Sequence, residues 1–235
     1  MKVHYIQHAD SEDLANILPW LIKHGHKTTR TLLHKGEKLP SMDTFDWLII
    51  MGGPMNADEH SKYPWLITEK AFIKKAIRSG KTVFGVCLGS QLIARCLGSK
   101  VGKNKFKEIG WHDVALTPAG RKSVLFRGFP PTFVPIHWHG DTFEIPKGIK
   151  RLARSAACRN QAFEYKGKVF AVQFHIEYSP KHIRDFYKVE YEPKVKGRYE
   201  QGEKQILSKS VLFKNLRSLM KLMLSNVEKS ASIKP

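Results

Sequence analysis

The first hundred residues alternate between two hydrophobic patterns. Four short runs have the composition of strands: residues 2–8, the β-branched run 27–33, and the apolar runs 46–53 and 81–86. Between them, apolar residues recur at helical spacing, which predicts three helices. These helices cover residues 11–25, 63–80 and 90–98. Because the strand runs are apolar on both faces, the pattern indicates an α/β fold with a mostly parallel sheet covered by helices.

The pattern changes after residue 100. Between 100 and 174, short strand-like runs are separated by Gly, Pro and Asn, which predicts hairpins and hence a small antiparallel addition to the sheet. Helical spacing returns at 179–192 and 209–227. No internal repeat or flexible linker divides the chain. We therefore expect one domain over 1–235, with a C-terminal helical extension at about 181–228 and a frayed tail at 229–235.

Composition narrows the class of protein. The chain of 235 residues has a formal net charge of +19, which raises the question of nucleic-acid binding. No nucleic-acid motif accompanies the dispersed basic residues, so we expect a solvated basic surface instead. Three cysteines are too few for a disulfide framework and indicate a reducing compartment. No signal-peptide pattern or membrane-spanning run is evident, and we expect a cytoplasmic protein that binds no membrane.

One cysteine occupies a sterically restricted position. Cys87 lies in the stretch Gly85-Val86-Cys87-Leu88-Gly89, between an apolar strand and a helix. This G-x-C-x-G pattern is the thiol counterpart of the G-x-S-x-G nucleophile elbow, in which glycines remove Cβ atoms that would clash at a sharp turn. The turn places sulfur at a helix N-terminus, where the helix dipole favours thiolate. Cys87 is therefore the candidate nucleophile, whereas we interpret Cys96 and Cys158 as structural.

A base and an orienting group follow at the end of another apolar strand. His175 ends the run 169–175, and Glu177 lies two residues further on. A turn at the strand end carries both side chains on one side, so the carboxylate can hold the imidazole while the other ring nitrogen faces the thiol. Strand ends at the carboxyl edge of a parallel sheet are also where open sheets bind ligands.

Two glycines supply a candidate oxyanion site. Gly52 and Gly53 end the apolar run at 46–53, which leaves their backbone N–H groups free to point into a cleft. With the N–H group of Leu88, Gly53 is placed to bind a developing oxyanion.

These motifs together resemble the class I glutamine amidotransferases, the family with a Cys-His-Glu triad. The resemblance rests on the GG-P loop at 52–54, on G-V-C-x-G-x-Q-x-x-A at 85–94 and on F-H-x-E at 174–177. Further stretches at 107–114 and 136–146 are most similar to stand-alone members related to the glutaminase part of GMP synthase. The resemblance implies a flavodoxin-like, twisted and mainly parallel sheet flanked by helices.

The resemblance also implies roles for individual residues. Cys87 would form a γ-glutamyl thioester, His175 would act as base and acid, and Glu177 would orient the imidazole. Four further residues would contact the substrate: they are Gln91, His139, Gly140 and Asp141. The sequence departs from many relatives at Ile176, where they have proline, and we expect only a local change in that turn.

His137, His139 and Asp141 also have the spacing of a zinc site. We interpret the segment as pocket lining instead, and expect no metal and no cofactor.

Three functions are compatible with these residues. The first is hydrolysis of glutamine, with ammonia passed to a synthetase partner, because the chain contains no ATP-binding Walker loop of its own. The second is hydrolysis of a γ-glutamyl peptide or conjugate by the same triad. The third belongs to another class, a non-catalytic protein that uses its basic surface for binding.

Overall fold

The computed structural model describes residues 1–189 and 197–232. Its main sheet has nine strands in the order β2-β1-β3-β4-β11-β10-β9-β6-β7. The first five in this order are parallel: β2 Lys27–Leu32, β1 Lys2–Gln7, β3 Trp47–Ile50, β4 Thr82–Val86 and β11 Val169–Val172. The remaining four continue the sheet by antiparallel pairing: β10 Ala162–Tyr165, β9 Arg151–Arg154, β6 Val114–Leu116 and β7 Thr132–Phe133.

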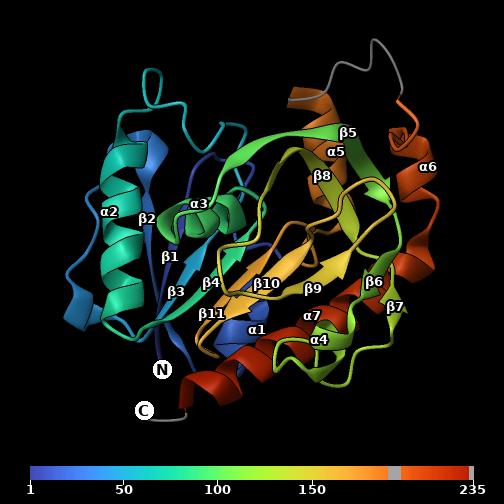
Figure 1. The fold of residues 1–235 in the computed structure, drawn as a ribbon. Helices are drawn as coiled ribbons and strands as arrows, with labels where there is room; N and C mark the ends of the chain where they lie inside the picture. The colour runs from blue at the N-terminus through green and yellow to red at the C-terminus, as the bar shows by residue number, and fades with distance from the viewer. Residues whose placement is uncertain (190–196, 233–235) are drawn as a thin grey trace.

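A second, two-stranded sheet pairs β5, Val101–Trp111, with β8, Ile136–Phe143, in antiparallel register. This pair lies beside helix α5, Pro180–Val189 (Figure 1), and the rings of Trp138 and Phe186 have centroids 5.2 Å apart. The expected fold class, a parallel sheet flanked by helices with a small antiparallel addition, is confirmed.

Helices cover both faces of the main sheet because its central strands β3, β4 and β11 are buried on both faces. In β3, Trp47 and Ile49 join a core with α1 (Ile17–Lys23) and α7 (Ser210–Ser232). Leu48 and Ile50, pointing the other way, join a core with α2 (Trp65–Arg78) and α3 (Leu88–Cys96). The shorter helices are α4 Pro118–Lys122, α6 Glu203–Leu207 and the 3-10 turns Leu33–Lys35 and Met42–Thr44. Figure 1 shows α7 as the long red helix along the sheet.

Two sequence-based boundaries were wrong. The helix expected over 11–25 begins only at Ile17, because Ala15 has a φ of 45°, in the left-handed region that a helix does not contain. The tail expected to fray from 229 is helical as far as Ser232, and Ser230 within it is buried. Residues 233–235 of that tail lie outside the described residues. So do residues 190–192 of the helix predicted at 179–192.

The candidate site residues gather where the parallel strands end. Cys87 follows β4, Gln173 and His175 follow β11, and Gly52 follows β3. Over the described ranges, none of the helices has the length and hydrophobicity that crossing a bilayer requires. The carboxyl edge of the parallel strands is thus the place to look for chemistry.

Candidate active site

Cys87 sits on a strained turn between β4 and α3. Its φ is 51° and its ψ is −109°, a conformation that is rare for a residue with a side chain. The turn is held by the Cys87 N–H donating to the Val172 carbonyl at 2.9 Å. The flanking glycines are required by space: a Cβ on Gly89 would lie 2.1 Å from the Ile50 oxygen, and one on Gly85 would lie 2.6 Å from the backbone of Gly89. The backbone therefore has the form that the G-x-C-x-G pattern predicts.

His175 and Glu177 form a buried pair beside this turn. Nδ1 of His175 lies 2.6 Å from Oε1 of Glu177, and the second carboxylate oxygen accepts from the Ile176 N–H at 2.8 Å. The His175 ring stacks on Tyr178 with centroids 4.0 Å apart. Its Nε2 atom is buried and has no hydrogen-bond partner among the described residues. The carboxylate thus fixes the ring and leaves the second nitrogen available for proton transfer.

The electrostatics of this pair favour a protonated imidazole. Burial opposes the charge, but the Glu177 carboxylate and then the Cys87 side chain outweigh it, so the pKa of His175 is raised well above its ordinary value. The other two thiols differ: burial raises the pKa of Cys96 to about 12 and that of Cys158 to about 11. Both are held as neutral thiols, which agrees with a structural role.

A pocket of about 300 Å³ opens at Cys87. Most of the residues expected to contact substrate line it: they are Gly53, Leu88, Gln91, His139, Gly140 and Asp141. His175 and Glu177 do not line this pocket, and both are fully buried. The fold therefore assembles the predicted site from separate segments of the chain around one cavity.

Buried hydrogen bonds from His8 hold the loop after β3 in place. His8 contacts the Gly52 carbonyl through Nδ1 at 2.8 Å and Glu69 through Nε2 at 2.8 Å. Burial opposes protonation of His8, but Glu69 outweighs it and raises its pKa. Gly53 leaves little room for a side chain, because a Cβ there would lie 2.9 Å from Cβ of His8, which the hydrogen bonds of the His8 ring hold in place. The buried pair thus fixes the backbone of the candidate oxyanion loop.

The side chain of Gln91 makes hydrogen bonds to other residues of the protein. Its side-chain amide donates to the Asp141 carbonyl at 3.3 Å and to Oε1 of Gln173 at 3.1 Å. The amide of Gln173 in turn lies 3.6 Å from the Cys87 sulfur, which also lies 3.8 Å from the Trp138 carbonyl. Gln91 thus connects the pocket wall to the cysteine through Gln173.

Several residues of the site were missed from the sequence. Gln173 and Tyr178 flank the His175–Glu177 pair along the chain, so their proximity was a usable signal. Glu12 and Lys107 also line the pocket, and Tyr178 donates to Glu12 at 2.7 Å. Lys107 begins the stretch 107–114 that resembles the family, so its position was also a usable signal. Glu12 lies near no other motif in sequence, so only the fold brings it to the pocket.

Residues 14–188 match the family model described as Glutamine amidotransferase class-I. The protein therefore belongs to the class I glutamine amidotransferase family, which confirms the family expected from the motifs. The glutamine amidotransferase-like protein YfeJ of Salmonella typhimurium is 33% identical over 183 residues, 76% of this chain and 77% of YfeJ. The crystal structure of a glutamine amidotransferase from Thermotoga maritima has a TM-score of 0.88 at 30% identity and covers 99% of both chains.

Two further relatives differ in the activity that their names state. One component of the glutamine-hydrolyzing GMP synthase of Thermococcus kodakarensis is 34% identical over 109 residues, 45% of this chain and 56% of that component. Gamma-glutamyl peptidase 3 of Arabidopsis thaliana is 27% identical over 143 residues, 59% of this chain and 57% of the peptidase. The match thus spans little more than half the length of each.

Proposed function

We propose that the protein hydrolyses the γ-amide of glutamine through a covalent γ-glutamyl thioester on Cys87, with release of ammonia and glutamate. The observation that carries the proposal is the pairing of a strained cysteine turn with His175, whose Nδ1 is fixed by Glu177 at 2.6 Å while Nε2 is left without a hydrogen-bond partner among the described residues. A nucleophile, a base and an orienting carboxylate in this order form a complete relay for acyl transfer.

The reaction has two halves. His175 takes the thiol proton, the Cys87 sulfur bonds to the γ-carbonyl carbon, and the resulting oxyanion faces the N–H groups of Gly53 and Leu88. The intermediate collapses with cleavage of the carbon–nitrogen bond, and His175 gives its proton to the departing nitrogen, which leaves as ammonia. Water then attacks the thioester, its proton goes to His175, and the carbon–sulfur bond breaks to release glutamate. The proton returns to the Cys87 sulfur.

The charged groups of the pocket favour an amino-acid end of the substrate. Glu12 and Asp141 supply carboxylates and Lys107 an ammonium group around the same 300 Å³ pocket. Such a set complements the α-ammonium and α-carboxylate groups that glutamine and γ-glutamyl peptides share. The pocket therefore supports the γ-glutamyl class of substrate, and the leaving group distinguishes the members of that class.

A second candidate is hydrolysis of a γ-glutamyl peptide by the same residues, in which an amine leaves in place of ammonia. The similarity to gamma-glutamyl peptidase 3 favours it. The similarity to a GMP synthase component favours the glutaminase form, in which a separate synthetase is the partner that uses the ammonia. Assays of glutamine and γ-glutamyl dipeptides side by side, by release of ammonia and of free amino acid, separate the two.

Trapping tests both forms together. The protein is incubated with a diazo-ketone analogue of glutamine and the labelled residue is located by mass spectrometry. We expect a single label on Cys87 that excess glutamine or γ-glutamyl dipeptide suppresses, with Cys96 as the internal control. Labelling spread over the other thiols, together with no hydrolysis of either substrate, contradicts the proposal and favours a non-catalytic binding protein.

A further inference from the structure

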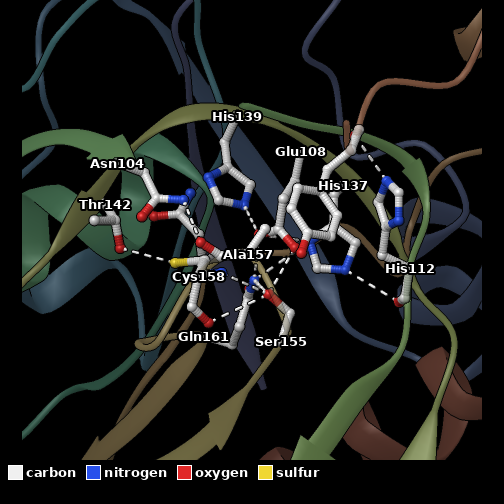
Figure 2. A network of polar contacts seen from close by, with 12 residues as sticks. Asn104, Glu108, His112, His137, His139, Thr142, Ser155, Ala157, Cys158 and Gln161 are labelled. Atoms are coloured by element: carbon white, nitrogen blue, oxygen red, sulfur yellow. Dashed lines mark hydrogen bonds and ion pairs between the residues drawn. The ribbon is translucent and has the colours of Figure 1, made fainter. Parts of the chain in front are cut away.

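Three buried side chains converge behind the wall of the pocket. Glu108 lies on β5, and His137 and His139 lie on β8, paired across the second sheet in the register Glu108–His139 and Gly110–His137. Oε2 of Glu108 lies 3.0 Å from Nε2 of His139 and 3.7 Å from Nδ1 of His137. Figure 2 shows both imidazoles turned toward this carboxylate. The side chains of Glu108 and His137 are fully buried, and that of His139 is 1% exposed.

The protons of this cluster are fixed by its outer contacts. A carbonyl oxygen only accepts, so Nδ1 of His139, 3.0 Å from the Asp141 carbonyl, carries hydrogen. The same holds for Nε2 of His137, 3.3 Å from the His112 carbonyl. In the neutral rings, Nε2 of His139 and Nδ1 of His137 are therefore lone pairs, and both are directed at a carboxylate. Oε2 of Glu108, Nε2 of His139 and Nδ1 of His137 are thus three neighbouring hydrogen-bond acceptors.

Hydrogen bonds leave this set of acceptors incomplete. The amide nitrogen of Gln161 lies 2.8 Å from Oε2 of Glu108 and 3.4 Å from Nδ1 of His137. Nε2 of His139, by contrast, meets the criteria for a hydrogen bond with none of the described residues, although it lies 3.0 Å from Oε2 of Glu108. Oε1 of Gln161 is likewise buried and unpartnered among them. Buried lone pairs without donors are costly, and a cation among them removes that cost.

We propose that Glu108, His137 and His139 bind a divalent transition-metal ion of the zinc class. Two imidazole nitrogens and a carboxylate are a zinc ligand set with one open position, and ligand bonds of about 2.0–2.2 Å place tetrahedral neighbours about 3.4 Å apart. The observed 3.0 and 3.7 Å separations lie on either side of that value. A flip of the Gln161 amide would bring its unpartnered oxygen to the fourth position.

The outer shell has the form that metal sites use. Histidine ligands commonly donate their other N–H group to a backbone carbonyl, and ligating carboxylates are themselves hydrogen-bonded. Both histidines do so here, and Oε1 of Glu108 accepts from the Ser155 hydroxyl at 2.6 Å. The carboxylate that completes the set is Glu108 and not the nearby Asp141, whose side chain is hydrogen-bonded by Asn56.

The site lies between two cavities. Glu108 and Ser155 line a surface pocket of about 520 Å³, which gives an ion access from solvent. His139 lines the catalytic pocket on the other side. Its neighbour Trp138 has its carbonyl 3.8 Å from the Cys87 sulfur. A metal bound here would fix the segment of β8 that forms the wall next to the nucleophile, without touching substrate.

Binding is tested with the full chain after treatment with chelator. The protein is titrated with Co²⁺ and followed by its visible absorption, then with Zn²⁺ by calorimetry. We expect one equivalent of Co²⁺ with the intense absorption of a four-coordinate site, displaced by Zn²⁺. The same result is expected in the C87S variant, which lacks the nucleophile. The readout is thus independent of the proposed hydrolysis.

Matched variants assign the ion to its ligands. Glu108→Gln should weaken Zn²⁺ binding by at least about 100-fold, because loss of even an outer-shell partner costs about 10–100-fold. His24, His26 and Glu228 form a second, more exposed His-His-Glu group, so Glu228→Gln is the matched control and should leave the tight site unchanged. If E108Q does not fold by circular dichroism, His137→Gln replaces it.

Two results would overturn the proposal. One is the absence of a stoichiometric Co²⁺ spectrum at about 1 mM free Co²⁺, which is about 100 times a Kd of about 10 μM and would fill even a weak site. The other is a spectrum that E228Q abolishes while E108Q, or its replacement H137Q, retains it. In either case Glu108, His137 and His139 do not form the metal site.

Discussion

Replacing Glu177 by glutamine tests the relay with minimal change of shape. In the native site one carboxylate oxygen receives the His175 N–H at 2.6 Å and the other receives the Ile176 N–H at 2.8 Å. A glutamine has one oxygen and one NH2 group. If the oxygen faces His175, two N–H donors oppose each other at Ile176. If the amide is turned, its NH2 group faces Nδ1, and the ring must carry its proton on Nε2, where it no longer serves as a base.

The expected losses of stability and of kcat follow from those two arrangements of the glutamine. An unpaired buried donor costs about 1–3 kcal/mol of stability, which for a chain of this size is about 2–4 °C in Tm per kcal/mol. The wrong ring tautomer lowers kcat by about 10⁴-fold in the serine protease relay, or about 5 kcal/mol in the barrier. We expect E177Q to fold, to melt a few degrees lower and to lose about 10³–10⁴-fold in kcat.

The pH dependence provides a second readout. Although burial opposes it, Glu177 and Cys87 raise the pKa of His175 in the folded protein. Its protonated ring therefore stabilises the fold below the unfolded pKa, and this stabilisation is lost as pH rises from near neutrality through the folded pKa. Denaturant unfolding from about pH 6 to 10, which spans the ordinary histidine pKa and the range above it, should show a shallower decline for E177Q than for the native protein.

The assay is ammonia release in a coupled glutamate dehydrogenase reaction, with blanks that lack glutamine. The exposed Glu144 provides the control, because Glu144→Gln makes the same change of charge away from the relay. An E177Q variant that is folded and keeps more than a tenth of native kcat would refute the role assigned to this carboxylate.

Three further results are expected. Cys87→Ser should lower hydrolysis by at least about 10³-fold while the Tm is retained, and full turnover would exclude this nucleophile. Gly89→Ala should lower the free energy of unfolding, measured with urea, by about 1–3 kcal/mol, because its Cβ would lie 2.1 Å from the carbonyl oxygen of Ile50 in β3. Gly102→Ala is the control and should be neutral, since its Cβ would lie in open space. Equal unfolding midpoints for the two variants would contradict this. Under mildly alkaline conditions iodoacetamide should modify Cys87 before Cys96 and Cys158, whose pKa values burial raises to about 12 and 11; the reverse order by mass spectrometry would be inconsistent with the site.

The parallel half of the fold was predictable because its signals are local. Its central strands β3, β4 and β11 are continuous apolar runs, the edge strand β2 is marked by its β-branched threonines, and α2 and α3 show clear helical spacing. The strand Val101–Trp111 was not predicted as such. Its sequence is largely polar over the first seven residues, where it pairs with β8 and most of its residues are exposed or half-buried. The helix after β1 was predicted too early because the left-handed Ala15 leaves no mark in the hydrophobic pattern.

The same distinction holds within the site. Cys87 and the His175–Glu177 pair each lie within a short motif whose chemistry can be read along the chain. Glu108 is different: it meets His137 and His139 only because β5 and β8 pair with a register shift between Lys103 and Glu108. Such a shift depends on tertiary packing, so the sequence pattern indicated Asp141 as the nearby carboxylate instead.

The long helix α7 has a practical consequence for handling this protein. Met220, Met223, Leu224 and Val227 bury its inner face in the core, and Asn226 donates to the carbonyls of Leu125 and Arg127. A proteolytic cut or an expression boundary placed before residue 220 would expose a broad hydrophobic surface of the sheet and promote aggregation. Purification handles therefore belong beyond Ser232, and intact mass should be checked before any loss of activity is ascribed to a point mutation.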